Sequence, residues 1–200
     1  MYDMSIKGHM NEIELKVIER WASEVPENGV IVEVGSLFGR SAVAWAKSCH
    51  PSVNVYCVDA FYDAQGDNDF YDEFHENTKD IPNIHPVARV CPFFKYSKHI
   101  GEPADIFFVD AAHFNPNDWH IIQFGLRNLK SGGLLCGHDY LSTFPDVKLN
   151  VNRLEEMFGK PATFYSGTSL WSFTVTNTDS IPESVPFVTR GASAAATAKV

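Results

Sequence analysis

The chain has 200 residues, of which 44% are hydrophobic and 13% aromatic, and a formal charge of −9 at pH 7. This composition is typical of a globular domain with a full core, and no apolar run approaches the roughly 18 residues that a membrane-spanning helix needs. Because the charge is negative, the basic residues are scattered and the N-terminus lacks a signal-peptide apolar region, we expect a cytoplasmic protein whose partner is a small molecule rather than a nucleic acid or a membrane.

The chain opens with a lead and a helix, together residues 1–28. Asn11 can cap a helix through residue 23, and Glu14 stands at the capping-box position. Its apolar face is expected to contain residues that recur every four positions, Ile13, Val17 and Trp21. Ile18 and Ala22 widen this face, and Leu15 lies at its margin.

Strands then alternate with helices along the chain. The five predicted strands are 30–34, 53–59, 84–90, 104–110 and 134–137. Ser131-Gly132-Gly133 is the expected stop signal of the helix that precedes the last of them. The predicted helices are 41–47, the second half of 61–80, 116–129 and 147–158, and 163–166 with 170–175 form a closing pair. This alternation predicts a Rossmann-like, doubly wound α/β fold whose seven-stranded sheet is mostly parallel, with an antiparallel C-terminal pair. Residues 1–176 are expected to form one domain, and 177–200 a disordered tail.

The turn after the first strand indicates a cofactor site. Gly35 and Gly39 flank Ser36-Leu37-Phe38, and Asp59 ends the next strand. In such folds an acid at that place accepts hydrogen bonds from ribose hydroxyls. The middle glycine that a dinucleotide pyrophosphate needs is missing, so the spacing favours S-adenosylmethionine over NAD. The alternative is that both glycines merely make a tight turn.

Acids follow three strands, at Asp59, Asp110 and Asp139, and two of them stand near His113 and His138. Since strand carboxyl ends share one edge of a parallel sheet, these side chains should converge there. Carboxylates with imidazole could bind Mg²⁺ or Mn²⁺, which could hold substrate hydroxyls while His113 accepts a proton. Alternatively, Asp110 only caps a loop or touches the cofactor, and His138 is an ordinary core histidine.

An aromatic and acidic segment, Tyr62 to Phe74, follows the second strand. It could be a lid that stacks on a substrate ring, or a helix that simply packs on the sheet.

Five motifs together resemble the class I S-adenosylmethionine-dependent methyltransferases, and more narrowly the group of macrocin-type sugar O-methyltransferases and cephalosporin-hydroxylase-like proteins. The resemblance covers residues 6 to 175, and its motifs are 6–10, 33–41, 58–61, 108–113 and 130–140.

The resemblance implies roles for individual residues. The cofactor would contact Glu33, Gly35, Ser36, Gly39, Arg40, Ser41, Asp59 and Asp110. A metal would be held by Asp110, His138 and Asp139, although relatives carry an acid where His138 stands. Ala112 replaces the relatives' base, so the catalytic candidates are His113 and Asp110. The usual polar contact to adenine is also missing at 90–93, which leaves stacking and backbone contacts, or weaker cofactor binding.

The sequence therefore predicts an S-adenosylmethionine-dependent O-methyltransferase that acts on a hydroxyl of a small polar acceptor, a sugar or glycoside being the favoured class, with Mg²⁺ or Mn²⁺ as a candidate metal. By the same resemblance it could form homo-oligomers. One alternative is a catalytically inactive binding protein of this fold, and another is an NAD-linked oxidoreductase, which the glycine spacing disfavours.

Overall fold

The computed structural model of the protein describes residues 2–62, 70–97 and 101–176. The predicted tail, 177–200, lies outside the described residues, as does 63–69 within the predicted lid. In the described part, seven strands form one sheet of order β3-β2-β1-β4-β5-β7-β6. The strands β1 to β5 pair in parallel, and β7 runs antiparallel to both β5 and β6. The predicted fold class is confirmed.

The strands are β1 Val30–Val34, β2 Asn54–Asp59, β3 Ile84–Ala88, β4 Ala104–Val109, β5 Leu129–Gly137, β6 Thr163–Phe164 and β7 Trp171–Thr174. The helices are α1 Glu12–Ser23, α2 Arg40–Ser48, α3 Tyr71–Thr78, α4 Cys91–Tyr96, α5 Asn117–Asn128 and α6 Pro145–Phe158.

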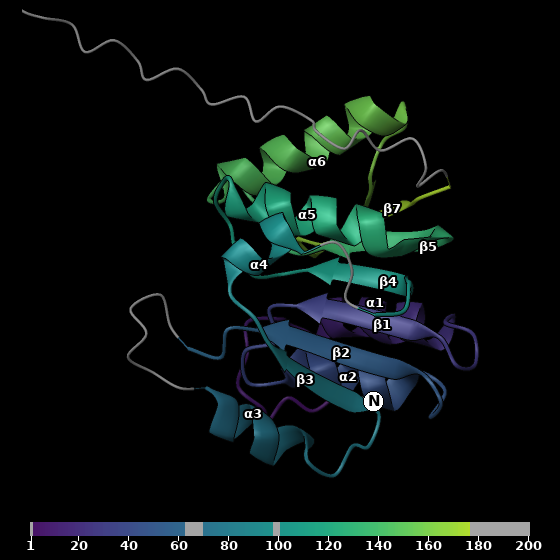
Figure 1. Ribbon diagram of the computed structural model, residues 1–200, viewed down its shortest axis with the longest axis vertical. Coiled ribbons are helices and arrows are strands. Elements are labelled where there is room, and N and C mark those ends of the chain that lie inside the picture. The colour runs from purple at the N-terminus through teal and green to yellow at the C-terminus, as the bar shows by residue number, and fades with distance from the viewer. Residues whose placement is uncertain (1, 63–69, 98–100, 177–200) are drawn as a thin grey trace, which may run out of the picture.

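Helices cover both faces of the sheet, as Figure 1 shows with α1 and α2 behind it and α4 and α5 in front. The strand β1 is buried along its whole length, and its side chains alternate between two apolar cores. Val32 belongs to the core with α5, whereas Ile31 belongs to the core with α1 and α2. A strand buried on both faces has no solvent-facing polar side, which explains why β1 is apolar at every position except Glu33.

The predicted capping box of α1 is confirmed, because Asn11 and Glu14 exchange hydrogen bonds between side chain and backbone. Its predicted apolar face is confirmed at Ile18, Trp21 and Ala22, which are buried, and is wrong at its edge. Leu15 and Ile18 are fully buried, whereas Ile13 is 52% exposed. The helix is rotated because it packs on α2, where Trp21 stacks on Trp45 with ring centroids 6.2 Å apart.

Two boundaries also differ from the prediction. The strand β5 begins at Leu129, because that residue pairs with Ala104 ahead of an irregularity in the β4–β5 register. Residues 131–133, predicted to follow the end of the preceding helix, lie within this strand, and α5 ends at Asn128. The helix α4 was not predicted; Pro92 in its first turn is compatible with a helix start.

Candidate active site

The glycine turn joins β1 to α2 and lies directly against the end of β4. Gly35 has φ +97°, and a Cβ atom there would lie 2.0 Å from the carbonyl oxygen of Asp110. Gly39, with φ +91°, precedes α2 and faces Phe74 and Thr78 of α3. Both glycines thus meet backbone demands of the turn itself, and Gly39 does not line the cavity described below.

Asp59, at the end of β2, holds this turn through its carboxylate. Its Oδ2 accepts hydrogen bonds from the amides of Ser36 at 2.7 Å and Leu37 at 2.8 Å, and its Oδ1 accepts one from Phe61 at 2.9 Å. A carboxylate can accept about four hydrogen bonds. Asp59 therefore retains room for one more donor, such as a ribose hydroxyl.

Glu33 lies beneath the turn and does not line the cavity. Its carboxyl group is fully buried and accepts hydrogen bonds from the Ser36 hydroxyl at 2.6 Å and the Trp45 indole at 3.1 Å. Burial raises the pKa of Glu33 to about 7 despite these donors. Glu33 is placed to hold the Ser36 side chain from below.

Arg40 holds the N-terminal segment that precedes α1. Its Nε donates to the carbonyl oxygen of Ile6 at 2.6 Å, and its Nη1 donates to that of Met10 at 2.8 Å. Gly8 packs on the Arg40 side chain, where a Cβ atom would approach it to 3.1 Å. The guanidinium is thus directed at backbone carbonyls, and Ser41 beside it is buried but lines the cavity.

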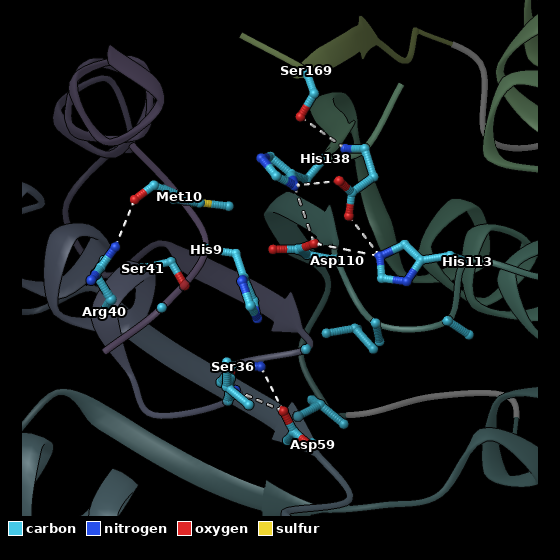
Figure 2. Close-up of a pocket in the computed structure, with 18 of the residues that line it drawn as sticks. His9, Met10, Ser36, Arg40, Ser41, Asp59, Asp110, His113, His138 and Ser169 are labelled. Carbon is cyan, nitrogen blue, oxygen red and sulfur yellow. Dashed lines mark hydrogen bonds and ion pairs between the residues drawn. The ribbon is translucent and has the colours of Figure 1, made fainter. Parts of the chain in front are cut away.

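A cavity of about 1080 Å³ opens at the carboxyl edge of the sheet (Figure 2). The glycine turn and Asp59 form one part of its wall, and the ends of β4 and β5 form another. The N-terminal segment Lys7–Met10 and the start of α4 also contribute. Among the predicted site residues, those that line this cavity are Gly35, Ser36, Arg40, Ser41, Asp59, Asp110, His113, His138 and Asp139.

Four of these residues form a compact cluster after β4 and β5. The Nε2 of His113 lies 2.7 Å from Oδ2 of Asp139 and 4.0 Å from Oδ1 of Asp110. The Nδ1 of His138 lies 3.2 Å from Oδ1 of Asp139 and 3.5 Å from Oδ1 of Asp110. The sequence prediction that Asp110 and Asp139 converge is confirmed by this geometry, and Asp59 lies apart from them (Figure 2).

The charges in this cluster stabilise one another. Contacts with Asp110 and Asp139 raise the pKa of His113 to about 9. Burial opposes a charge on His138, but contacts with Asp110, Asp139 and Glu14 outweigh it and raise its pKa to about 12. Burial likewise opposes ionisation of Asp139, yet the two histidines hold its pKa well below the usual range. These contacts favour the doubly protonated, positively charged form of both rings, in which His113 donates hydrogen bonds.

The ligand set that the structure offers to a cation differs from the predicted one. Ligand atoms of Asp110, His113 and Asp139 lie within 4.8 Å of one another, which fits part of the coordination shell of a divalent ion. His138 is not in this set; its Nδ1 faces the same two carboxylates, and its Nε2 faces Glu14 at 3.0 Å. The geometry therefore adds His113 to the residues that the sequence suggested for a metal, and the role of His138 stays a prediction.

Glu14 is a residue of this site that the sequence revealed only as a helix cap. Although it belongs to α1, its side chain lines the same cavity and is only 4% exposed. Charged residues are seldom buried without a partner. One feature of the sequence could have identified Glu14: it is an acidic residue in the first turn of a helix, among residues that face the core.

The cavity, the sheet order and the strand-end acids can be compared with known proteins. The family profile described as "Methyltransferase domain" matches residues 32–140 of the chain. No curated protein sequence matches significantly.

Several solved structures share the fold at low sequence identity. A SAM-dependent O-methyltransferase from Thermotoga maritima is 18% identical with a TM-score of 0.58, over 76% of this chain and 52% of that one. An rRNA methylase from Streptococcus thermophilus is 16% identical with a TM-score of 0.55, over 83% of this chain and 96% of that one. A precorrin-6y C5,15-methyltransferase from Geobacter metallireducens is 13% identical with a TM-score of 0.61, over 87% of this chain and 93% of that one.

The chain thus spans about half the length of the Thermotoga protein and most of the other two. None of the helices among the described residues is long and apolar enough to cross a membrane. From the family match, the sheet order and the site at the carboxyl ends of its strands, the chain belongs to the methyltransferase domain family and has the fold of the class I S-adenosylmethionine-dependent methyltransferases.

Proposed function

We propose that the protein transfers the methyl group of S-adenosylmethionine to a hydroxyl oxygen of a small polar acceptor, with a sugar or glycoside as the favoured class. One observation carries this proposal. A single cavity of about 1080 Å³ is lined both by the glycine turn with Asp59 and by the cluster of Asp110, His113, His138 and Asp139. A cofactor held on the first side would present its methyl group to an acceptor held on the second.

The cofactor side offers few but well-placed polar groups. Asp59 would accept a ribose hydroxyl, and Ser36 and Ser41 would face the methionine part, with Glu33 supporting Ser36 from below. Apolar residues at the start of α4 line the same cavity, namely Val90, Cys91 and Phe94. Adenine would lie against these residues, which is consistent with the missing polar contact in the sequence.

On the acceptor side, the required chemistry is positioning and removal of one proton. The acceptor oxygen attacks the methyl carbon, the carbon–sulfur bond breaks, and the hydroxyl proton must leave. His113 is already protonated at neutral pH, so the Asp110 carboxylate is the better proton acceptor. His113 would donate a hydrogen bond to the acceptor oxygen or to its neighbour.

A divalent ion is compatible with this arrangement. Asp110, His113 and Asp139 would hold it, and His113 would then have to bind as the neutral ring. When bound, such an ion would lower the pKa of the acceptor hydroxyl.

The charge of the chain favours a small acceptor over RNA, although the fold is shared with an rRNA methylase. A net charge of −9 opposes association with the phosphate backbone, to which nucleic-acid affinity is largely due. We therefore place a small molecule first, and the test below includes RNA.

The proposal is tested by following methyl transfer from labelled S-adenosylmethionine to a panel of sugars, glycosides and phenols, with total RNA as a further arm and with Mg²⁺, Mn²⁺ or chelator. We expect product with a hydroxylated small molecule, and at least a 100-fold lower rate in the Asp110→Asn, Asp139→Asn double variant at little-changed cofactor affinity. Product on RNA alone would contradict the acceptor class. Cofactor binding without transfer to any acceptor would favour an inactive binding protein.

A further inference from the structure

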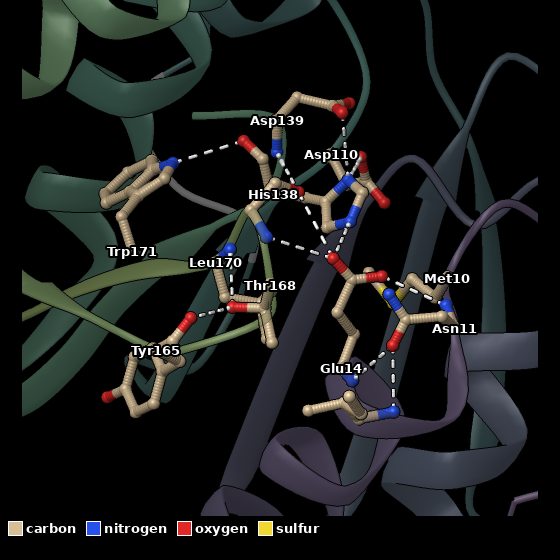
Figure 3. A network of polar contacts seen from close by, with 12 residues as sticks. Met10, Asn11, Glu14, Asp110, His138, Asp139, Tyr165, Thr168, Leu170 and Trp171 are labelled. Carbon is tan, nitrogen blue, oxygen red and sulfur yellow. Dashed lines mark hydrogen bonds and ion pairs between the residues drawn. The ribbon is translucent and has the colours of Figure 1, made fainter. Parts of the chain in front are cut away.

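The buried carboxylate of Glu14 links three segments that meet at the acceptor side of the cavity (Figure 3). Its Oε2 accepts a hydrogen bond from the Asn11 amide at 3.0 Å, which closes the capping box of α1. Its Oε1 accepts from the amide and the hydroxyl of Ser169, at 3.1 and 3.3 Å. Capping alone would not require an acid here to be buried, so the second oxygen calls for another explanation.

That oxygen also faces the ring of His138. The distance from Oε1 of Glu14 to Nε2 of His138 is 3.0 Å, and the contact is an ion pair without directed hydrogen-bond geometry. On the opposite side of the ring, Nδ1 faces Asp139 and Asp110 at 3.2 and 3.5 Å. The ring is therefore held between one carboxylate on its outer side and two on its inner side.

The backbone around His138 is fixed separately by the hairpin that closes the sheet. Trp171 donates from its indole nitrogen to the carbonyl oxygen of His138 at 3.2 Å, and the Asp139 amide donates to the Ser169 hydroxyl at 3.2 Å. Asp139 itself has φ +62°, a conformation that needs such support. With the backbone fixed by the hairpin, the orientation of the His138 side chain depends on its charged neighbours.

We propose that Glu14 is a positioning residue that holds the His138 ring against Asp110 and Asp139 and thereby fixes the two carboxylates that face the acceptor. The importance of this for methyl transfer rests on the proposed function, but the contacts themselves do not. In this arrangement the His138 ring lies between the Glu14 carboxylate at Nε2 and the carboxylates of Asp110 and Asp139 at Nδ1. Glu14 touches no residue of the glycine turn by any contact described, so the cofactor side should be indifferent to it.

The test uses His113 as a reporter, because it contacts Asp139 and has no described contact with Glu14. The ring nitrogen signals of His113 are recorded by NMR in the full chain, at one pH, with ¹⁵N-labelled histidine. The variants are Glu14→Gln, His138→Gln and the two combined, and Asn11→Ala is the control because it weakens the same helix N-terminus without removing the Glu14 carboxylate.

We expect Glu14→Gln and His138→Gln each to shift the His113 signals, and the double variant to shift them no further than His138→Gln alone, as for residues acting in series. Asn11→Ala should leave them within the linewidth. Binding of S-adenosylhomocysteine should change less than about threefold in Glu14→Gln.

A His113 signal that stays at its wild-type position in Glu14→Gln, or shifts that add fully in the double variant, would overturn the proposal. If Glu14→Gln does not fold, Glu14→Asp draws the carboxylate back from His138 while keeping its charge, and the same comparison is made with it. Methyl transfer is measured separately on the wild type. A coupled network in a protein that methylates nothing would refute the proposed function and leave the positioning role intact.

Discussion

The buried carboxyl group of Glu33, beneath the glycine turn, makes the stability of the protein depend on pH. Its pKa is raised by burial from 4.5 to about 7. The unfolded chain therefore loses this proton at lower pH than the folded protein does. The stability that the protonated form contributes is complete below about pH 4.5 and is lost as pH rises through 7.

We predict that Glu33→Gln, which keeps the shape and stays neutral, stabilises the protein at pH 8 by up to about 3 kcal/mol and leaves it nearly unchanged at pH 4.5. Denaturant unfolding at the two pH values measures this. A variant that is less stable than the wild type at pH 8 would show that the charged form is the one the fold uses.

The contribution of His113 to stability should change at a higher pH than that of Glu33. Its folded pKa of about 9 lies above the unfolded value of 6.5, because Asp110 and Asp139 favour the charged ring. Its stabilising contribution is thus full below pH 6.5 and is lost as pH rises through about 9. We predict that His113→Gln lowers stability at pH 6 and has a flatter stability profile between pH 7 and 10 than the wild type. Parallel profiles for the two proteins would contradict the charged pair.

For some single residues, the sequence predicts the position in the fold but not the hydrogen-bond partners. The strand-end position of Asp59 was readable from the chain, since it follows from the alternation of strands and turns. Two of its three backbone hydrogen bonds were not, because they depend on the path of a turn 22 and 23 residues away in the chain. The same holds for Arg40, which lines the cavity as predicted but whose hydrogen bonds to backbone carbonyls of the N-terminal segment could not be read from the sequence.

At the scale of elements, the N-terminal segment is a wall of the cavity that depends on one side chain. Lys7 to Met10 line the cavity, and Arg40 donates to the carbonyls of Ile6 and Met10. We predict that Arg40→Ala weakens S-adenosylhomocysteine binding about tenfold, which corresponds to about 1.4 kcal/mol. Calorimetry measures this, with Arg20→Ala as the control because Arg20 lies against Tyr165 and does not line this cavity. Wild-type affinity in Arg40→Ala would mean that the segment is not needed for binding.

The close contact of Gly35, in the turn after β1, with the backbone of Asp110 can be tested by substitution. Gly35→Ala would place a Cβ atom 2.0 Å from the Asp110 carbonyl oxygen, so β4 or the turn must move. We expect a loss of about 3 kcal/mol or more in the free energy of unfolding. Gly132→Ala is the matched control, since Gly132 also has positive φ but meets nothing within 4 Å; about 1–2 kcal/mol is expected there. Equal losses in the two variants would contradict the close approach.

Helices and strands could be predicted from the sequence where one hydrophobic pattern dominates a segment. The apolar runs of β1 and β4 and the caps of α1 are local signals, and the structure confirms them. The rotation of α1 and the early start of β5 were not local, because they are set by packing on α2 and by pairing with β4. In both elements, tertiary contacts outweigh the preference that the local sequence pattern expresses.

For the whole molecule, the central feature is that two chemically different regions share one cavity at the edge of the sheet. The parallel topology made this predictable, because the ends of β1, β2, β4 and β5 must lie side by side. The pairing of each histidine with its carboxylates was not predictable. His138, for example, contacts Glu14, which lies more than 120 residues earlier in the chain.

The most direct test of the account is calorimetric titration with S-adenosylhomocysteine, comparing the wild type with Asp59→Ala and using NAD as the control ligand. We predict that the wild type binds S-adenosylhomocysteine at micromolar concentration, that NAD gives no heat, and that Asp59→Ala loses at least tenfold in affinity while remaining folded by circular dichroism. A folded wild type that does not bind S-adenosylhomocysteine, or that binds it unchanged in Asp59→Ala, would contradict the cofactor assignment on which the proposed function depends.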